Sequence, residues 1–270
     1  MTTKADWQDT VGQSWASSHA LTDRSFSGLT EHLLGRIGEY AGETVLDIGC
    51  GAGELSLAIA RARPRARVFG VDVSADLIAA ARARAGGEKV RFELGDAAKW
   101  TEPGLAPDLL VSRHGVMFFD DPPRAFAHLH GIAGSAAHLV FSCFRRPREN
   151  IWASGIAGLL GLPPGDPEAP GPFAFAEPQR VERILEAGGW GQIDFEPVDF
   201  AWIAGKGADP VADAMNFYAR IGPAAPALRA LAGEERTAAE TILRNWLTAH
   251  RSGDLVAFAA AAWIVTAHYG

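Results

Sequence analysis

The segment Val45–Gly53 constrains the fold of this chain more than any other, because an apolar strand pattern there runs directly into three glycines. Gly49, Gly51 and Gly53 stand at alternate positions, and a helical pattern follows from Glu54. Glycines permit a tight turn and let a ligand approach the backbone closely. The start of the following helix offers unpaired N–H groups to a polar or negative ligand. The segment therefore predicts a ligand crevice at the carboxyl end of a buried strand.

Short apolar runs alternate with helical patterns from residue 43 to about residue 143. This order predicts parallel strands joined by right-handed crossovers, with helices covering both faces of the sheet. The predicted strands are Thr44–Ile48, Ala66–Val71, Val90–Leu94, Asp108–Ser112 and His138–Cys143, and the predicted helices are Glu54–Ala62, Asp76–Ala85 and Pro123–Ile132.

Both ends of the chain add helices and one further strand. Phe26–Ile37 has apolar residues at helical spacing, which predicts a helix packed on the edge or the top of the sheet. Prolines between residues 144 and 175 indicate an irregular loop after a helix around Ile151–Leu160. A helix from Pro178, a strand over Ile193–Ile203 and a largely helical Pro210–Arg251 are expected to follow.

Acidic residues stand directly after two of the predicted strands. Asp72 ends the second strand and can accept both hydroxyls of a ribose, and Asp96 follows the third and can accept from an adenine amino group. Each alone fits a helix N-cap equally well. Together with the glycine loop, they predict a nucleoside-containing ligand.

A dinucleotide-binding oxidoreductase is the natural alternative, because its loop is similar. Its G-x-G-x-x-G/A pattern needs a small residue where Glu54 stands, and Asp47 inside the strand is not part of that pattern. These two departures argue against the dinucleotide interpretation.

Val45–Gly53, Val71–Ser74 and Leu94–Ala97 resemble the first three motifs of the class I S-adenosylmethionine-dependent methyltransferases. Ser112–Phe119, followed by Asp120–Pro122, is similar to the fourth-strand region of the small-molecule group that includes the quinone-biosynthesis C-methyltransferases. The resemblance implies an enzyme that transfers a methyl group from S-adenosylmethionine to a small molecule by in-line attack on the sulfonium methyl. A relative that uses a modified S-adenosylmethionine for another transfer, or a non-catalytic binding module, would carry the same three motifs.

The resemblance also implies an α/β fold, namely a Rossmann-like, doubly wound sheet of seven strands in the order 3-2-1-4-5-7-6. The last strand would be antiparallel to the others and lie within Leu255–His268. The chain would form a single methyltransferase domain, residues 1–270. Its predicted parts are an N-terminal helical lid at 1–40, a cofactor-binding core at 43–143, and substrate-covering insertions at 144–175 and 204–252.

The family's roles fall on particular positions of this sequence. The three glycines would surround the methionine portion of the cofactor, Asp47 would orient the loop, and Ser112 and Arg113 would line the methionine side through their backbones. The predicted cofactor-binding residues are Trp15, Asp47, Gly49, Gly51, Gly53, Asp72, Val73, Asp96, Ala97, Ser112 and Arg113.

His114 lies just past the fourth strand, at the rim where an acceptor would approach. It is the candidate general base, which is needed only if the acceptor must lose a proton. A histidine hydrogen-bonded to neighbouring loops explains the position as well. Aromatic and Met side chains in the insertions predict a small, apolar or aromatic acceptor, although core packing explains each of them equally; they are Trp152, Phe173, Phe175, Met215, Phe217 and Tyr218.

Charge and cysteine content narrow the function further. The chain has 25 basic and 32 acidic residues, a net charge of −7, and no concentrated basic stripe, which argues against nucleic acid as a partner. Cys50 and Cys143 form neither a metal-ligand pattern nor a disulfide framework, so no metal is expected. Neither a signal peptide nor a span long enough for a bilayer is visible, so a cytoplasmic monomer or homodimer without a membrane partner is expected.

Overall fold

The computed structural model describes residues 4–163 and 165–270, so residues 1–3 of the predicted lid and Pro164 of the predicted insertion lie outside the described residues. Its strands form one sheet in the order β3-β2-β1-β4-β5-β8-β6, with β7 paired to β8. The strands are β1 (Thr44–Ile48), β2 (Arg67–Asp72), β3 (Val90–Leu94), β4 (Leu109–Arg113), β5 (His138–Phe144), β6 (Trp190–Lys206), β7 (Arg251–Ser252) and β8 (Leu255–Tyr269).

The sheet confirms the predicted fold class. β1 to β5 pair in parallel, whereas β8 is antiparallel to both of its long neighbours, β5 and β6. β8 is the predicted seventh strand, and its number is higher only because the two-residue β7 precedes it. The predicted strand boundaries in the core lie within one residue of the observed ones.

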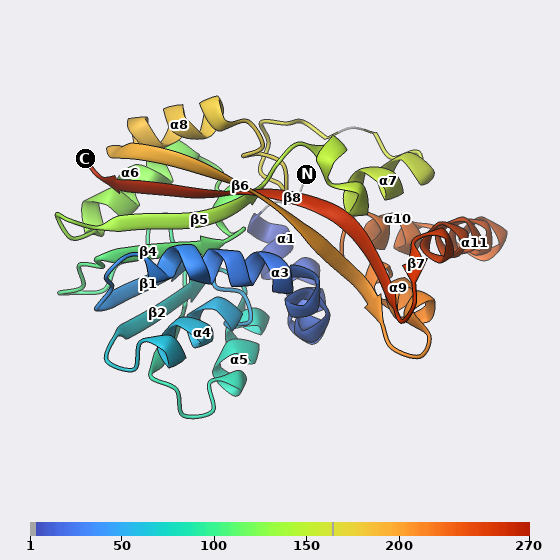
Figure 1. Ribbon diagram of the computed structural model, residues 1–270, viewed down its shortest axis with the longest axis horizontal. Coiled ribbons are helices and arrows are strands. Elements are labelled where there is room, and N and C mark those ends of the chain that lie inside the picture. Colours follow the sequence, from blue (N-terminus) through green and yellow to red (C-terminus); the bar gives the residue numbers. More distant parts are fainter. Residues whose placement is uncertain (1–3, 164) are drawn as a thin grey trace.

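Helices cover both faces of this sheet, with α3, α4 and α5 on one face and α6 and α8 on the other (Figure 1). The helices are α1 (Lys4–Gln8), α2 (Thr10–Ser17), α3 (His19–Gly38), α4 (Glu54–Ala62), α5 (Ala75–Arg84), α6 (Pro122–Ile132), α7 (Ile151–Leu159), α8 (Pro178–Ala187), α9 (Pro210–Tyr218), α10 (Ala224–Ala230) and α11 (Gly233–Ala249). No helix in the described part of the chain combines the length and the apolar character needed to cross a bilayer.

The predicted N-terminal amphipathic helix is α3. Its apolar stripe, including Phe26, Leu29 and Leu33, is buried against the sheet, and the helix packs most of all on the edge strand β6. His19 is the first residue of α3. Its Nδ1 forms a 2.9 Å hydrogen bond with the carbonyl of Ala16, which places the ring at the junction between α2 and α3.

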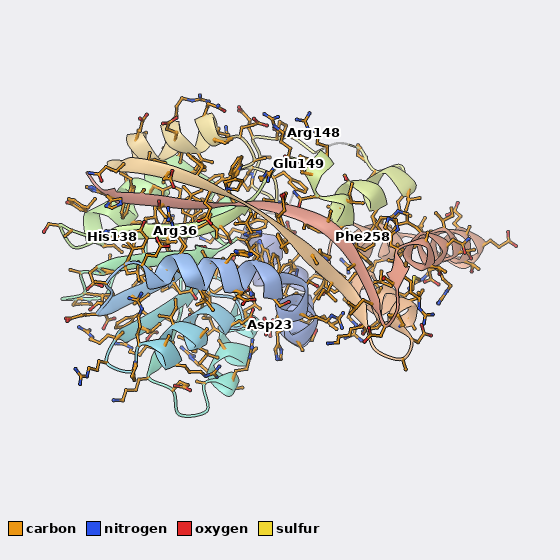
Figure 2. All side chains as sticks on the ribbon, viewed as in Figure 1. Asp23, Arg36, His138, Arg148, Glu149 and Phe258 are labelled. Carbon is orange, nitrogen blue, oxygen red and sulfur yellow. The ribbon has the colours of Figure 1, made fainter. Side chains whose placement is uncertain are left out.

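β6 and β8 are longer than the rest of the sheet and together extend beyond it, where they carry α9, α10 and α11 (Figure 1). Phe258 lies in this extension, at the right of Figure 2, and stacks on Trp246 of α11 with ring centroids 4.4 Å apart. The helical stretch predicted over Pro210–Arg251 extends too far at its C-terminal end. The last helix, α11, ends at Ala249, and Arg251 pairs with Val256 in the β7–β8 hairpin. The long hairpin thus holds a helical unit beside the carboxyl ends of the parallel strands.

Candidate functional site

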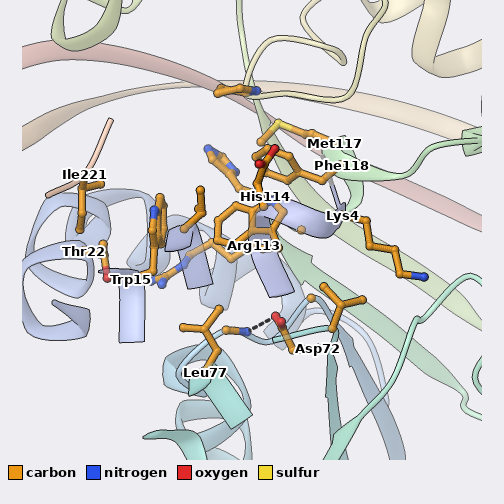
Figure 3. A pocket seen from close by; sticks show the side chains of 18 of the residues that line it. Lys4, Trp15, Thr22, Asp72, Leu77, Arg113, His114, Met117, Phe118 and Ile221 are labelled. Atoms are coloured by element: carbon orange, nitrogen blue, oxygen red, sulfur yellow. Dashed lines mark hydrogen bonds between the residues drawn. The ribbon is translucent and has the colours of Figure 1, made fainter. Parts of the chain in front are cut away.

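A cavity of about 1290 Å³ opens at the carboxyl ends of β1, β2 and β4 and extends to α7 and α10 (Figure 3). The structure brings most of the predicted site residues together around it. Those that line it are Trp15, Asp47, Gly49, Gly51, Asp72, Val73, Asp96, Ala97, Arg113 and His114. The remaining two predicted residues support the loop from behind. Ser112 donates to the carbonyl of Ile48 at 2.6 Å and accepts from the amide of Gly115, and a Cβ on Gly53 would lie 2.7 Å from the ring of Phe92.

The glycine loop is tight because its backbone folds against neighbouring chain segments. Gly49 has a φ of 65°, and a Cβ there would lie 2.9 Å from the Cα of Gly115. The amides of Gly49 and Cys50 both donate to the carbonyl of Val71. Gly51 also has a positive φ, but no atom lies within 4 Å of where its Cβ would be. The loop therefore leaves open space over Gly51, on the side of the cavity.

Asp72 fixes the loop and faces the cavity at the same time. Its Oδ2 accepts from the amide of Gly51 and its Oδ1 from the amide of Ser74, both at 2.9 Å. Burial raises the pKa of this carboxyl, and the backbone hydrogen bonds oppose that shift. Each carboxylate oxygen can accept more than one hydrogen bond. Asp72 can therefore hold the loop and still accept from two hydroxyl groups of a ligand.

Asp47 carries a buried oxygen for which the protein supplies no partner. Its Oδ2 accepts from the hydroxyl of Ser56, but its Oδ1 has no hydrogen-bond partner among the described residues. Burial raises the pKa of Asp47 to about 7, against the hydrogen bond from Ser56 and the charge of Arg113. A ligand that brings a donor or a positive charge to this oxygen would offset that cost.

Asp96 is held by the N-terminal segment. Its Oδ2 lies 2.6 Å from the Nζ of Lys4, and its Oδ1 accepts from the amide of Ala98. Although partial burial acts in the other direction, these hydrogen bonds lower the pKa of Asp96. The Lys4 and Asp96 side chains are 34% and 23% exposed, and such pairs contribute only about 0–1 kcal/mol. The ion pair is therefore weak enough for a ligand group to replace it.

The N-terminal helices cover this end of the cavity. The ring of Trp7 lies 5.3 Å from that of Trp15 and 5.1 Å from that of Phe118, measured between centroids. α2 packs so closely on the start of α5 that a Cβ on Gly12 would lie 2.3 Å from the hydroxyl of Ser74. This packing is compatible with the predicted lid at residues 1–40, which remains a prediction.

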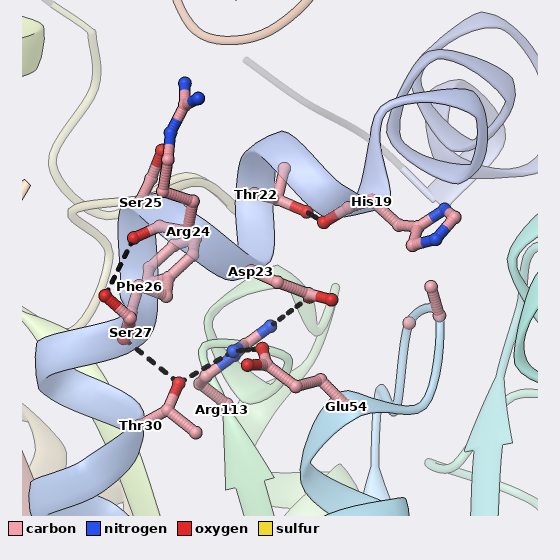
Figure 4. A network of polar contacts seen from close by, with 12 residues as sticks. His19, Thr22, Asp23, Arg24, Ser25, Phe26, Ser27, Thr30, Glu54 and Arg113 are labelled. Atoms are coloured by element: carbon pink, nitrogen blue, oxygen red, sulfur yellow. Dashed lines mark hydrogen bonds and ion pairs between the residues drawn. The ribbon is translucent and has the colours of Figure 1, made fainter. Parts of the chain in front are cut away.

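Sequence reasoning missed a charged network at the same end of the cavity (Figure 4). The side chain of Arg113 forms an ion pair with Glu54, lies 3.7 Å from Asp23, and donates to Thr30 at 2.8 Å. Burial raises the pKa of Glu54 to about 7, and the charge of Arg113 opposes that shift. Asp23 also pairs with Arg84 at 2.7 Å. Glu54 directly follows the glycine loop, so its position near the site could have been predicted from the sequence. Asp23 could not, because it reaches the site only through the packing of α3.

His114 lies between the two halves of the cavity. Its φ is 65°, its side chain is only 7% exposed, and its Nδ1 is 2.7 Å from the hydroxyl of Ser142. The other ring nitrogen, Nε2, is buried and has no hydrogen-bond partner among the described residues. Burial and the nearby charge of Arg113 lower the pKa of His114 to about 3. The imidazole is therefore neutral at ordinary pH and suited to hydrogen bonding rather than to holding a proton.

Aromatic side chains wall the far half of the cavity. Trp152 and Trp202 stack with centroids 4.1 Å apart, and Phe144 lies 5.0 Å from Trp152. Of the residues expected to line an acceptor pocket, Trp152 and Phe173 do so. The others do not line it; Phe175, Phe217 and Tyr218 are fully buried, and Met215 packs against the core. Trp202 also lines the cavity, and the sequence did not predict it because it lies in the strand β6 rather than in an insertion.

The environment of Cys143 does not suit a nucleophile. Cys143 is fully buried against the carbonyl of Phe175, and burial raises its pKa. Across residues 4–163 and 165–270, no group of three or more His, Cys, Asp or Glu side chains is placed to hold a metal ion.

Comparison with known proteins places the site in a family context. Residues 45–133 match the protein family described as "Methyltransferase domain". The trans-aconitate 2-methyltransferase of Variovorax paradoxus is 36% identical over 103 residues, which are 37% of this chain and 39% of that protein. The corresponding protein of Methylobacterium radiotolerans is 28% identical over 158 residues, 57% of this chain and 56% of that one. The chain thus spans between 38% and 56% of the length of the first three such relatives.

Solved structures share the fold over more of the chain. Phosphoethanolamine N-methyltransferase 2 of Haemonchus contortus, in complex with phosphomonomethylethanolamine and S-adenosylhomocysteine, superposes with a TM-score of 0.59 at 14% identity over 97% of this chain and 59% of its own. The YcgJ protein of Bacillus subtilis has a TM-score of 0.54 at 18% identity and covers 88% of this chain and 98% of its own. The resemblance to the quinone-biosynthesis group is not confirmed by these relatives.

Proposed function

Because the chain belongs to the class I S-adenosylmethionine-dependent methyltransferases, we propose that it transfers the methyl group of this cofactor to a small molecule. One observation carries the proposal. A single cavity is lined by the glycine loop and Asp72, which suit a nucleoside, by aromatic side chains around Trp152, and by His114, whose ring lies 4.0 Å from that of Phe144. This arrangement can hold a nucleoside-containing methyl donor and a methyl acceptor next to each other.

The residues of the first half fit S-adenosylmethionine. Asp72 has acceptor capacity left for the two ribose hydroxyls, and the open space over Gly51 leaves room for the ligand beside the loop. The unpartnered Oδ1 of Asp47 suits the positively charged methionine end. Asp96 would exchange Lys4 for the adenine amino group, with Ala97 and Val73 beside the rings, and Trp15 would cover the site from the lid.

When bound, the cofactor supplies an electrophilic methyl group, whose carbon–sulfur bond breaks as the acceptor's lone pair forms the new bond to carbon. The chain's own task is to align the acceptor with that group and to exclude water, which can supply much of the rate. We propose that the Nε2 of His114 orients the acceptor by one hydrogen bond, because this nitrogen is buried beside the cavity and unpartnered. A pKa of about 3 makes the ring a weak base, so a proton that the acceptor must lose would pass to solvent when the methylated product is released.

The acceptor is proposed to be a small, partly apolar or aromatic metabolite. Support comes from the stacked Trp152 and Trp202 and from the mainly apolar residues that line the cavity after residue 143. The relatives' names make trans-aconitate one compound to test. A cytoplasmic location, a monomeric or homodimeric state and the absence of a nucleic-acid partner belong to the same proposal, and the net charge of −7 supports the last of these.

Calorimetry and turnover test the proposal in two steps. The protein should bind S-adenosylmethionine and S-adenosylhomocysteine but not NAD. With a panel of metabolites that includes trans-aconitate, it should release S-adenosylhomocysteine and a methylated product. Binding without any turnover would favour a non-catalytic module, and a different group appearing on the product would favour a modified cofactor. Failure to bind either nucleoside would refute the proposal.

A further inference from the structure

Charge is divided unevenly between the two halves of the cavity. The half nearer the parallel strands contains several carboxylates, among them Asp47, Glu54 and Asp72. The lining contributed after residue 143 contains no acidic residue in the described part of the chain, and its only charged members are Arg220 and Arg229. This is unexpected in a protein whose net charge is −7. The cavity thus has a negative end and a positive end.

The two arginines are available to a ligand. Arg220 follows α9 and Arg229 lies in the last turn of α10, and both are exposed at the cavity. Neither guanidinium forms a hydrogen bond or an ion pair with any side chain in residues 4–163 and 165–270. In contrast, Arg113 at the other end is fully engaged with Glu54, Asp23 and Thr30. Arg220 and Arg229 therefore have free donors, as has the exposed Arg124 of α6, whereas the buried arginine of the cofactor end, Arg113, has none to spare.

A second and independent observation is a buried polar atom of the cavity lining that lacks a partner among the described residues. The side chain of His114 is 93% buried, since only 7% of it is exposed, and its Nε2 has no partner among the described residues. Buried polar atoms without a partner are rare in native proteins, and a ligand atom is one explanation for them. Trp152 and Trp202, stacked with ring centroids 4.1 Å apart, line the same cavity as this nitrogen and the two arginines.

We infer that the methyl acceptor is an amphipathic organic anion. Its oxyanion group would be held at the rim by Arg220 and Arg229, its apolar body would lie against Trp152 and Trp202, and its reacting atom would meet His114. This assignment rests on the proposed function and adds the chemical class of the acceptor. Arginine binds carboxylate and phosphate oxygens alike, so the shared feature is an oxyanion on an apolar body.

Matched acids and amides test the inference without knowledge of the natural acceptor. Dissociation constants for octanoate, octanamide, 4-phenylbutyrate, 4-phenylbutyramide and octyl phosphate would be measured by ligand-observed NMR, with saturating S-adenosylhomocysteine. Because both arginines are exposed, each is expected to contribute roughly 5-fold, so each acid should bind at least about 10-fold more tightly than its amide. The octyl phosphate arm shows whether the rim prefers a carboxylate or a phosphate.

Variants assign the preference to the rim. The double variant Arg220→Gln/Arg229→Gln should lose the preference for acids and leave the affinity for amides within about 2-fold. Arg244→Gln is the matched control, because Arg244 is an exposed residue of α11 outside the cavity. It should bind as the native protein does.

Three results would overturn the inference: acids that bind no better than amides, no binding of any probe, or a preference that survives in the double variant. Affinity for S-adenosylhomocysteine, measured on the same samples, separates this failure from failure of the proposed function. Loss of nucleoside binding in the native protein would refute the function, whereas native nucleoside binding without an acid preference would refute only the anion assignment.

Discussion

Asp72→Asn tests the cofactor site more sharply than removal of the whole side chain. Alanine would release the amides of both Gly51 and Ser74 and so disturb the loop itself. Asparagine keeps the shape of the side chain and one acceptor oxygen, but it replaces the other oxygen with a donor. It therefore removes acceptor capacity at the cavity while it keeps much of the support of the loop.

The expected loss of cofactor affinity in Asp72→Asn follows from the number of hydrogen bonds that the variant loses. Two of the acceptor positions of Asp72 are already occupied by backbone amides, which leaves the others for the ribose. Losing one hydrogen bond to a charged group costs about 1.5–3 kcal/mol, or roughly 10–150-fold in the dissociation constant. Thermal stability is not diagnostic here. Removing a buried charge stabilises the fold, whereas an amide facing an N–H destabilises it.

Isothermal titration with S-adenosylhomocysteine provides the assay. Asp76→Asn, an exposed residue in the first turn of α5, is the matched control and should change the affinity by less than about 2-fold. An analogue lacking the ribose 2′-hydroxyl extends the test, because its loss in affinity and that of Asp72→Asn should not add if the two groups contact each other. Native affinity in a folded Asp72→Asn protein, or full additivity with the analogue, would refute the assignment of Asp72 to the ribose.

The remaining predictions concern the buried carboxylate, the lid and the histidine. The pKa of Asp47 is raised to about 7 from 3.8, so its contribution to stability is present below pH 4 and lost as the pH rises toward 7. Asp47→Asn should therefore raise the melting temperature of the ligand-free protein by several degrees at pH 8 and not at pH 4, as thermal melts would check. Deleting residues 1–17, which stops before α3 and spares the ion pair of Asp23, should leave a folded protein with turnover reduced at least 10-fold; full activity would show that α1 and α2 are not a lid. His114→Asn, chosen because asparagine tolerates a φ of 65°, should lower turnover about 10–100-fold with cofactor affinity unchanged, and the native pH–rate profile should show no step from this histidine between pH 5 and 8. If turnover fell only a few-fold, the other residues of the cavity lining would be enough to align the acceptor, and the role proposed for His114 would be wrong.

The parallel core and its loop could be predicted from the sequence because their signals are local. Strand, glycine loop and helix follow one another within 44–62, and Asp72 ends the next strand, so chain order alone brings them to one edge of the sheet. β8 shows where local signals fail. Its alanine-rich sequence favours a helix, yet it is a strand because it pairs with β5 on one side and β6 on the other. Only the resemblance to a family pointed to it.

β6 departs from its prediction in an instructive way. The alternation predicted 193–203, whereas the strand runs over Trp190–Lys206 with irregularities near Gln192 and Gly205. Pro197 inside it is tolerated because β6 is the edge strand, so no ladder is needed on its other side. The bulges hide the period of two from a reading of the sequence. The extra length matters for function, since it brings Trp202 to the wall of the cavity.

The acceptor half of the cavity was harder to infer for a different physical reason. Every aromatic side chain there has two equivalent explanations, a core contact or a pocket wall, and the sequence treats Phe175 and Phe173 alike. The fold separates them, because Phe175 is fully buried under the sheet while Phe173 faces the cavity. The charged residues of the cavity lining say more about the acceptor than the aromatic residues do. They can be identified only once the structure shows which residues line the cavity. In the sequence, Arg220 is one arginine in a helical stretch. The structure places it at a cavity whose lining after residue 143 has Arg229 as its only other charged member among the described residues. Specificity for the acceptor therefore resides in contacts between distant segments, whereas the cofactor site resides largely in consecutive ones.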